Sequence, residues 1–229
     1  MKRFLAIAVS VIFIVLALVS CGKDTDVPKG MMICKKNDFY TMFVPEDGWE
    51  VIETGSDFGL AQAKSKTIVG TGGDLSNVTV NSVYYLIDDK GVEGETPEEK
   101  NNRLFSAYFD KLKQQLTGEF DQIGDGTSNE GQKGLFTDFE LGATKDFKVG
   151  ENNAREYIYT AKYGDLYYKY YTTVILKTNY YVITFNFPQN VRQENGEIVK
   201  DTSIEDVTFN DSQYEDDMES IVNNFIPKK

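Results

Sequence analysis

The sequence predicts a mixed α/β (α+β) fold, a three-layer α/β/α sandwich built on a mainly antiparallel sheet. Residues 155–187 carry the strongest sheet pattern in the chain, three strands of about 155–163, 166–177 and 180–187 joined by tight turns. Residues 97–117 and 212–226 each carry one apolar face at helical spacing. The second of the three strands is apolar on both faces, so we expect one helix on each side of the sheet.

The N-terminal segment, residues 1–20, has the features of a secretory signal peptide. Lys2 and Arg3 form a basic start, and the apolar run from Phe4 to Val19 follows them. This run of 16 residues is shorter than the roughly 20 residues that a bilayer-spanning helix needs. An uncleaved anchor helix is the alternative, and in either case the body of the chain would lie outside the cytoplasm.

Leu18-Val19-Ser20-Cys21 resembles the lipobox of bacterial lipoproteins, in which a small residue precedes an invariant cysteine. The resemblance implies cleavage before Cys21 and lipidation of its thiol with acyl groups such as palmitate. One acyl chain holds a protein only reversibly, and the lipoprotein modification supplies at least two on one cysteine. We therefore expect a lipid anchor at the outer face of a cell membrane, or in the outer membrane where the organism has one.

The composition excludes several function classes. Removal of the leader would leave 209 residues with 22 basic and 36 acidic side chains, a net charge near −14. Such a chain is repelled by nucleic acid and by anionic headgroups, so the expected membrane contact is the lipid alone. Histidine is absent, which removes the commonest general base and transition-metal ligand. With Cys21 acylated, only Cys34 remains, and we expect it to be an inert thiol rather than an interchain partner.

The predicted organisation has three parts: the signal peptide (1–20), the lipidated cysteine with a flexible linker (21–37), and one globular domain (38–229). The linker prediction rests on Gly22–Gly30, which carries turn residues and no apolar periodicity.

The domain begins with a strand at Phe39–Val44 closed by Pro45, and a turn leads to a second strand at Trp49–Ile52. A short strand, then Val-Pro, then Gly-Trp resembles the opening of PsbP-like domains, related to the extrinsic photosystem II subunit and also found in bacterial lipoproteins. The resemblance covers roughly residues 39–226 and implies the three-layer fold and a role as an extrinsic, non-catalytic subunit. Trp49 could serve as a ligand platform, but a core anchor is the interpretation that we favour.

Residues 57–69 and 78–87 are two further strand candidates. The turn Gly70–Gly73 between them lacks the Gly-Lys-Ser/Thr of a phosphate loop. Thr96, Pro97 and Glu99 then form a capping box at the start of the first helix. The residues of its apolar face are Leu104, Phe105, Tyr108, Phe109, Leu112 and Leu116.

Residues 120–123 and 136–141 indicate strands with a glycine-rich loop between them. Nine of the fourteen tyrosines lie in the meander that follows, where they suit a half-buried sheet surface or, alternatively, could stack a sugar or a partner. In its third strand Tyr181, Ile183, Phe185 and Phe187 share one face. The last helix is predicted to start at a capping box of Ser212 and Glu215 and to end at Pro227.

No nucleophile elbow, catalytic triad or paired-cysteine metal motif is present, so we expect no enzyme, no cofactor and no metal site. The loop with Glu197, Asp201, Glu205, Asp206 and Asp211 lacks the EF-hand pattern. The leading hypothesis is an accessory lipoprotein that binds an envelope or membrane protein. The alternative is a lipoprotein that binds a small ligand or a divalent cation.

Overall fold

The computed structural model describes residues 26–52, 60–69, 76–117, 136–190, 192–195, 197–199 and 203–228. Several predictions fall outside these residues: the signal peptide, Cys21, the Gly70–Gly73 turn and the strand at 120–123. Within the described part of the chain, no helix is both long enough and apolar enough to cross a membrane.

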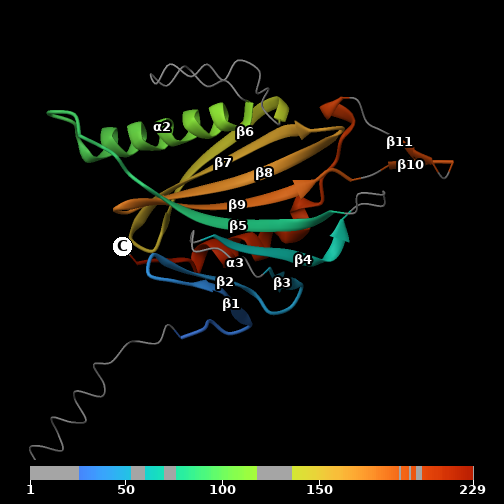
Figure 1. Ribbon diagram of the computed structural model, residues 1–229, viewed down its shortest axis with the longest axis horizontal. Coiled ribbons are helices and arrows are strands. Elements are labelled where there is room, and N and C mark those ends of the chain that lie inside the picture. Colours follow the sequence, from blue (N-terminus) through green and yellow to red (C-terminus); the bar gives the residue numbers. More distant parts are fainter. Residues whose placement is uncertain are drawn as a thin grey trace, which may run out of the picture.

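A seven-stranded antiparallel sheet forms the middle layer, in the order β3-β4-β5-β9-β8-β7-β6 (Figure 1). Its strands are β3 (Trp49–Val51), β4 (Ala61–Val69), β5 (Ser76–Leu86), β6 (Phe136–Val149), β7 (Asn152–Tyr163), β8 (Leu166–Leu176) and β9 (Asn179–Pro188). The predicted meander is confirmed as β7-β8-β9, and β6 is longer than the strand predicted at 136–141. The antiparallel sheet of the predicted fold class is therefore present.

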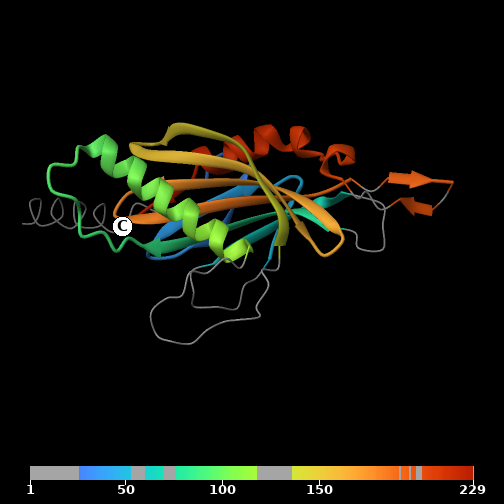
Figure 2. The same ribbon diagram turned by 90° about the horizontal axis from the view of Figure 1, so that it is seen from above.

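Helix α2 (Pro97–Thr117) lies across one face of this sheet (Figure 2). Its predicted capping box is confirmed: the Thr96 N–H donates to Glu99 Oε2 at 2.8 Å, and the Glu99 N–H donates to Thr96 Oγ1 at 3.3 Å. The predicted apolar stripe packs on the sheet, with Leu104 and Phe105 buried and its other four members half-buried.

The opposite face is covered by two elements, α3 (Glu215–Asn223) and a three-stranded antiparallel sheet of order β1-β2-β12. The strands of this small sheet are β1 (Met31–Lys36), β2 (Tyr40–Pro45) and β12 (Ile226–Pro227). The three layers of the prediction are present, but the third layer combines a helix with a sheet. Met31, β2 and α3 contribute to one core with the inner face of the large sheet.

The predicted linker over 21–37 is wrong for its last third, because residues 31–36 form β1 and pair with β2. A bulge near Cys34 breaks the alternation of buried and exposed side chains in β1, so the strand lacks the period-two pattern. Its structure depends on its partner strand. The chain is attached to the domain from Gly30 onward, because the Gly30 carbonyl accepts a hydrogen bond from the Glu46 N–H at 3.0 Å.

The predicted capping box of Ser212 and Glu215 is also wrong. Residues Asp211–Tyr214 form the 3₁₀ turn η2, and α3 starts after Tyr214 without a side-chain cap. Lys169 and Tyr171 of β8 both hold the carboxylate of Asp211, which fixes this turn to the sheet. The remaining elements are the hairpin β10 (Arg192–Glu194) and β11 (Glu197–Val199) and the turn η1 (Ile204–Asp206).

The core on the α3 side holds the residues predicted to face inward. Tyr181, Ile183, Phe185 and Phe187 are all fully buried on one face of β9, as their alternation predicted. Trp49 is a core anchor: its ring is buried against Tyr214, and its Nε1–H donates to Asp217 Oδ2 at 2.7 Å. A role for Trp49 as an open ligand platform is therefore excluded.

Candidate functional site

The layer beneath α2 is rich in aromatic rings. Tyr159 stacks on Tyr170 at 4.9 Å between ring centroids, and Phe109 stacks on Tyr157 at 4.4 Å. The hydroxyls of Tyr157 and Tyr180 donate to the backbone carbonyls of Phe105 and Leu104 at 2.8 and 2.9 Å. These two bonds attach the middle of α2 to β7 and β9. Most tyrosines of the meander thus belong to the two core clusters or pack against them, as predicted for a half-buried sheet surface.

A groove of about 250 Å³, here called the apolar groove, lies along one flank of α2. Side chains of β5, α2 and β9 line it, among them Tyr85, Leu86, Tyr108, Leu112 and Tyr180. Leu86 is 76% exposed and Tyr85 is 46% exposed at the end of β5. The groove therefore continues onto open apolar surface.

The two cationic side chains at the rim of the apolar groove, Arg103 and Lys111, differ in their ion pairs. Arg103 pairs with Asp89 at 2.9 Å and with Glu95 at 2.7 Å, and it thereby closes the connection between β5 and α2. The hydrogen bond from Arg103, assisted by the Gly91 N–H, lowers the pKa of Asp89 to about 2. Lys111 is exposed at the same rim and makes no ion pair with any described residue. Among the described residues, one cation at this rim is thus left without an ion-pair partner.

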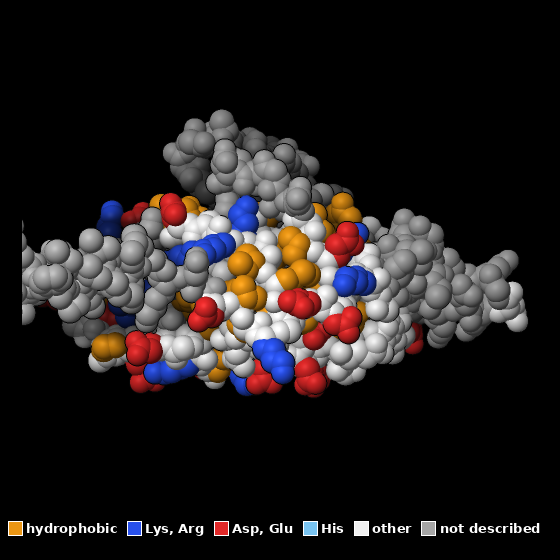
Figure 3. Space-filling model, turned by 90° about the horizontal axis from the view of Figure 1, so that it is seen from below, with side chains coloured by type: hydrophobic (Ala, Val, Ile, Leu, Met, Phe, Trp, Pro, Cys, Tyr) orange, Lys and Arg blue, Asp and Glu red, His pale blue; other side chains and the backbone are white. Residues whose placement is uncertain are grey.

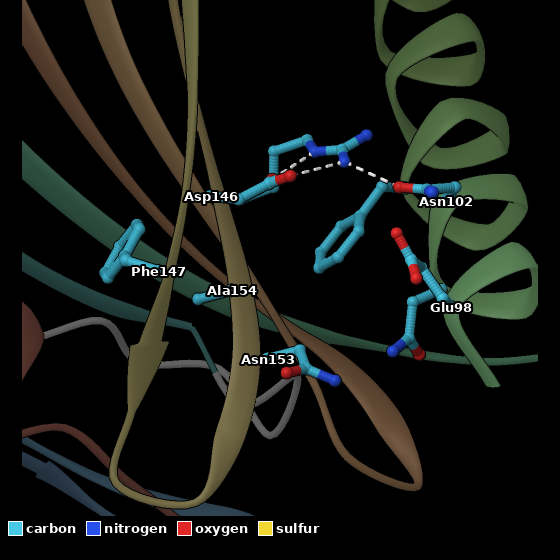
Figure 4. Close-up of a pocket in the computed structure, with 9 residues that line it drawn as sticks. Glu98, Asn102, Asp146, Phe147, Asn153 and Ala154 are labelled. Atoms are coloured by element: carbon cyan, nitrogen blue, oxygen red, sulfur yellow. Dashed lines mark hydrogen bonds and ion pairs between the residues drawn. The ribbon is translucent and has the colours of Figure 1, made fainter.

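A second hollow, here called the polar hollow, has a volume of about 310 Å³ and lies on another flank of α2 (Figure 4). Helix α2 contributes Glu98, Asn101, Asn102 and Phe105 to it. These positions are i, i+3, i+4 and i+7, so they form one helix face. Opposite them, β6 contributes Asp146, and β7 contributes Asn153 and Arg155.

Arg155 is the centre of the polar hollow. Its Nε donates to Asp146 Oδ1 at 2.5 Å, and its Nη2 donates to Asp146 Oδ2 and Asn102 Oδ1 at 2.8 Å each (Figure 4). The guanidinium carbon lies 4.8 Å from the centroid of the Phe105 ring. The hydrogen bonds from Arg155 lower the pKa of Asp146 below its usual value. This arrangement fixes the guanidinium between the sheet and the helix.

The acidic residues singled out in the sequence do not form a metal-binding cluster, as far as their side chains are described. Asp211 is bonded to Lys169 and Tyr171, and the side chains of Glu197 and Asp201 are outside the described part of the structure. In the described ranges, no three potential metal ligands come together. Cys34 is half-buried, and burial raises the pKa of its thiol to about 11, so it is a poor nucleophile at neutral pH.

Figure 3 shows the side of the molecule on which β1 lies. Hydrophobic side chains group near its middle, with acidic and basic side chains around them. The exposed large hydrophobic residues of the small sheet are Ile33 and Ile226. This side faces away from α2 (Figure 1), and α2 contributes to the lining of both hollows.

Neither hollow was predicted from the sequence. The one usable indication of the polar hollow is the run of Glu98, Asn101, Asn102 and Phe105 at one helix face, but Arg155 meets this face from 53 residues away. Nothing in the local pattern of Tyr85 and Leu86 distinguishes them from ordinary strand residues.

No protein-family model and no curated protein sequence matches the chain. Among solved structures, it is similar to a protein of unknown function from Pseudomonas aeruginosa, with 10% identity, a TM-score of 0.42 and coverage of 87% of this chain and 98% of that one. It is also similar to the cyanobacterial PsbP (CyanoP) of Synechocystis, with 14% identity, a TM-score of 0.38 and coverage of 91% and 97%. The predicted PsbP-like resemblance thus has a structural counterpart, at a level that carries no argument about function.

Proposed function

We propose that this chain is a lipid-anchored extracytoplasmic lipoprotein whose domain binds an envelope or membrane protein without catalysing a reaction. The observation that carries the binding role is the apolar groove with Tyr85 and Leu86 beside it. Leu86 and Tyr85 expose apolar surface at the end of one strand, and such surface is typical of interaction sites.

The chemistry of the apolar groove defines the partner. A protein side chain of leucine or phenylalanine size suits the space between Tyr108, Leu112 and Tyr180. Since Arg103 is occupied by Asp89 and Glu95, Lys111 is the cation left for the partner at this rim. The partner therefore presents an apolar anchor next to a carboxylate. Their attraction would speed association and weaken with salt.

A lipid anchor would keep the domain near the membrane, which favours a partner that is also near the membrane. With acylation at Cys21 and the fixed chain starting by Gly30, the connecting chain spans at most about 30 Å when fully extended. The chain enters the domain at β1, on the side opposite α2 (Figure 1). The apolar groove is then available to a protein that stands beside the anchored domain.

The anchor is tested by replacing Cys21. In Cys21→Ala, we expect no incorporation of a radioactive fatty acid and an accumulated precursor or a species released by mild washing. Cys34→Ala is the matched control and should label like the wild type. Equal labelling of Cys21→Ala and wild type would overturn the anchor.

The groove is tested with a photo-crosslinking amino acid at position 86, in the full-length chain in native membranes. The matched control carries it at position 226, an exposed site on β12 of the small sheet, which covers the other face of the large sheet. We expect one defined adduct from position 86, none from position 226, and less adduct when Lys111→Glu is added or salt is raised. Adducts from both positions, or an adduct insensitive to Lys111→Glu, would contradict the proposed surface.

Binding of a small ligand is the second candidate function. The observation that favours it is the polar hollow, whose volume lies at the lower end of the range typical of ligand sites. The divalent-cation form of this candidate has less support, because the two carboxylates there are Asp146, which is paired with Arg155, and Glu98. The absence of catalysis stays a prediction.

A further inference from the structure

The polar hollow has side chains whose hydrogen-bonding capacity the fold does not use. The amides of Asn101 and Asn153 make no side-chain hydrogen bond to another described residue. Asn102 accepts from Arg155 through Oδ1, and its NH₂ group donates to no described residue. The structure thus presents three amides, from two different elements, around one cavity (Figure 4).

The charges at the polar hollow disfavour anions. Arg155 is its one cation, and the bidentate pair with Asp146 neutralises it. Glu98 then leaves the lining with a net charge of −1. A phosphate or carboxylate ligand would need a guanidinium that is free to bind it, and here the guanidinium is already engaged.

Cations are disfavoured for a different reason. A metal ion needs several converging oxygen ligands, and among the described lining residues only Glu98 is a carboxylate without an ion pair to another described residue. An organic ammonium would gain from an aromatic face, but Arg155 already lies over the Phe105 ring. The side chain of Phe147 points away from the cavity (Figure 4) and supplies no second face.

We propose that the polar hollow binds a neutral, hydroxyl-rich ligand, a sugar or a polyol. A hydroxyl both donates and accepts, and an asparagine amide offers one acceptor next to two donors. Asn101 and Asn153 therefore match ligand hydroxyls without any change in charge. Asn102 and Asp146 are held by Arg155, so part of the site is fixed before the ligand arrives.

The site is independent of the proposed partner surface, because the polar hollow and the apolar groove use different flanks of α2. The helix face itself is positioned by the Thr96–Glu99 capping box and by the Tyr157 hydroxyl on the Phe105 carbonyl. Loss of sugar binding would thus leave the crosslink from position 86 intact, and the two proposals can fail separately.

The test is a titration of the full-length chain, observed through the side-chain amide resonances of its asparagines. The probes are glucose, N-acetylglucosamine and mannitol, compared with glucose 6-phosphate and putrescine. We expect the neutral probes to shift the resonances of Asn101, Asn102 and Asn153. The phosphate and the diamine should shift them less.

Substitutions of the asparagines then test which residues bind the neutral probes. Asn101→Ala and Asn153→Ala should each weaken binding of the neutral probes about 3- to 10-fold, the effect of one hydrogen bond. Both change side chains outside the core, so the fold should persist, as amide spectra will show. Asn223→Ala, on α3 at the other side of the sheet, is the matched control and should bind like the wild type. Absence of binding, tighter binding of phosphate or putrescine, or binding that these variants leave unchanged would each overturn the proposal.

Discussion

The two faces of the seven-stranded sheet are closed in different ways. On the α3 side, β9 presents fully buried side chains, and β2 of the small sheet adds its own fully buried side chains to the same core. On the α2 side, the one helix that the structure describes there lies over a layer rich in tyrosine, with a hollow along each of two flanks. One face is a closed core, and the other is a partly open one.

The two faces of the sheet therefore contribute differently, the α3 side to stability and the α2 side to the proposed binding. Close packing of apolar groups is the main source of stability, so the α3 side carries most of it. The α2 side uses hydrogen bonds from Tyr157 and Tyr180 to hold its helix, and each of these contributes modestly in net terms. A helix held in this way leaves side chains available for a ligand or a partner. Four predictions test this contrast, given in order from the largest expected effect to the smallest.

Truncation of the closed core should have the largest effect. Phe185 is 1% exposed, so Phe185→Ala should lower the free energy of unfolding by about 3–5 kcal/mol, the cost of a large cavity. Tyr180 lies half-buried on the opposite face of the same strand, and Tyr180→Ala should cost no more than half as much. Urea denaturation measures both, and equal losses would contradict the contrast.

Removal of one hydroxyl beneath α2 should have a smaller effect. Tyr157→Phe and Tyr180→Phe each delete a hydrogen bond to a helix carbonyl and keep the ring, so each should cost about 1 kcal/mol. Tyr163→Phe is the matched control, because Tyr163 is 48% exposed and makes no side-chain hydrogen bond to a described residue. A loss at Tyr163→Phe as large as at the other two positions would show that the hydroxyl bonds do not hold α2.

Acid should weaken the α2 side through Asp89. Its pKa falls from an ordinary 3.8 to about 2 because Arg103 hydrogen-bonds the charged form. A depressed folded-state pKa stabilises above the unfolded value, and this contribution is lost as the pH falls from about 4 to about 2. Asp89→Asn should therefore reduce the decline in stability over this window, measured by urea denaturation at each pH. Asp88→Asn, at its exposed neighbour, should leave the decline unchanged.

Divalent cations should have the smallest effect. A weak site occupied at its dissociation constant stabilises by about 0.4 kcal/mol, which is about 1–2 °C in Tm for a domain of this size. Screening of a strongly acidic chain can produce the same shift. Calcium and magnesium at equal ionic strength should therefore raise Tm equally. A calcium-specific gain of several degrees that Asp206→Asn abolishes would establish a cation site and overturn this expectation.

The sequence alone was sufficient for the elements whose patterns are local. The β7-β8-β9 meander, α2 with its capping box and the inward face of β9 follow from periodicity and turn residues over short spans. The antiparallel sheet with a helix on each side follows from these elements. The PsbP-like resemblance was likewise visible from the opening strands and the order of elements.

Only the tertiary structure decided the elements that depend on distant partners. β1 and β12 are strands because β2 pairs with both, although one precedes it and the other lies near the C-terminus. The start of α3 was mispredicted because Asp211 is held by β8, and a local capping pattern does not contain that contact. The two hollows lie along different flanks of α2. Their linings join residues from separate elements, and the packing of those elements, rather than any local sequence pattern, brings Arg155 to Asn102.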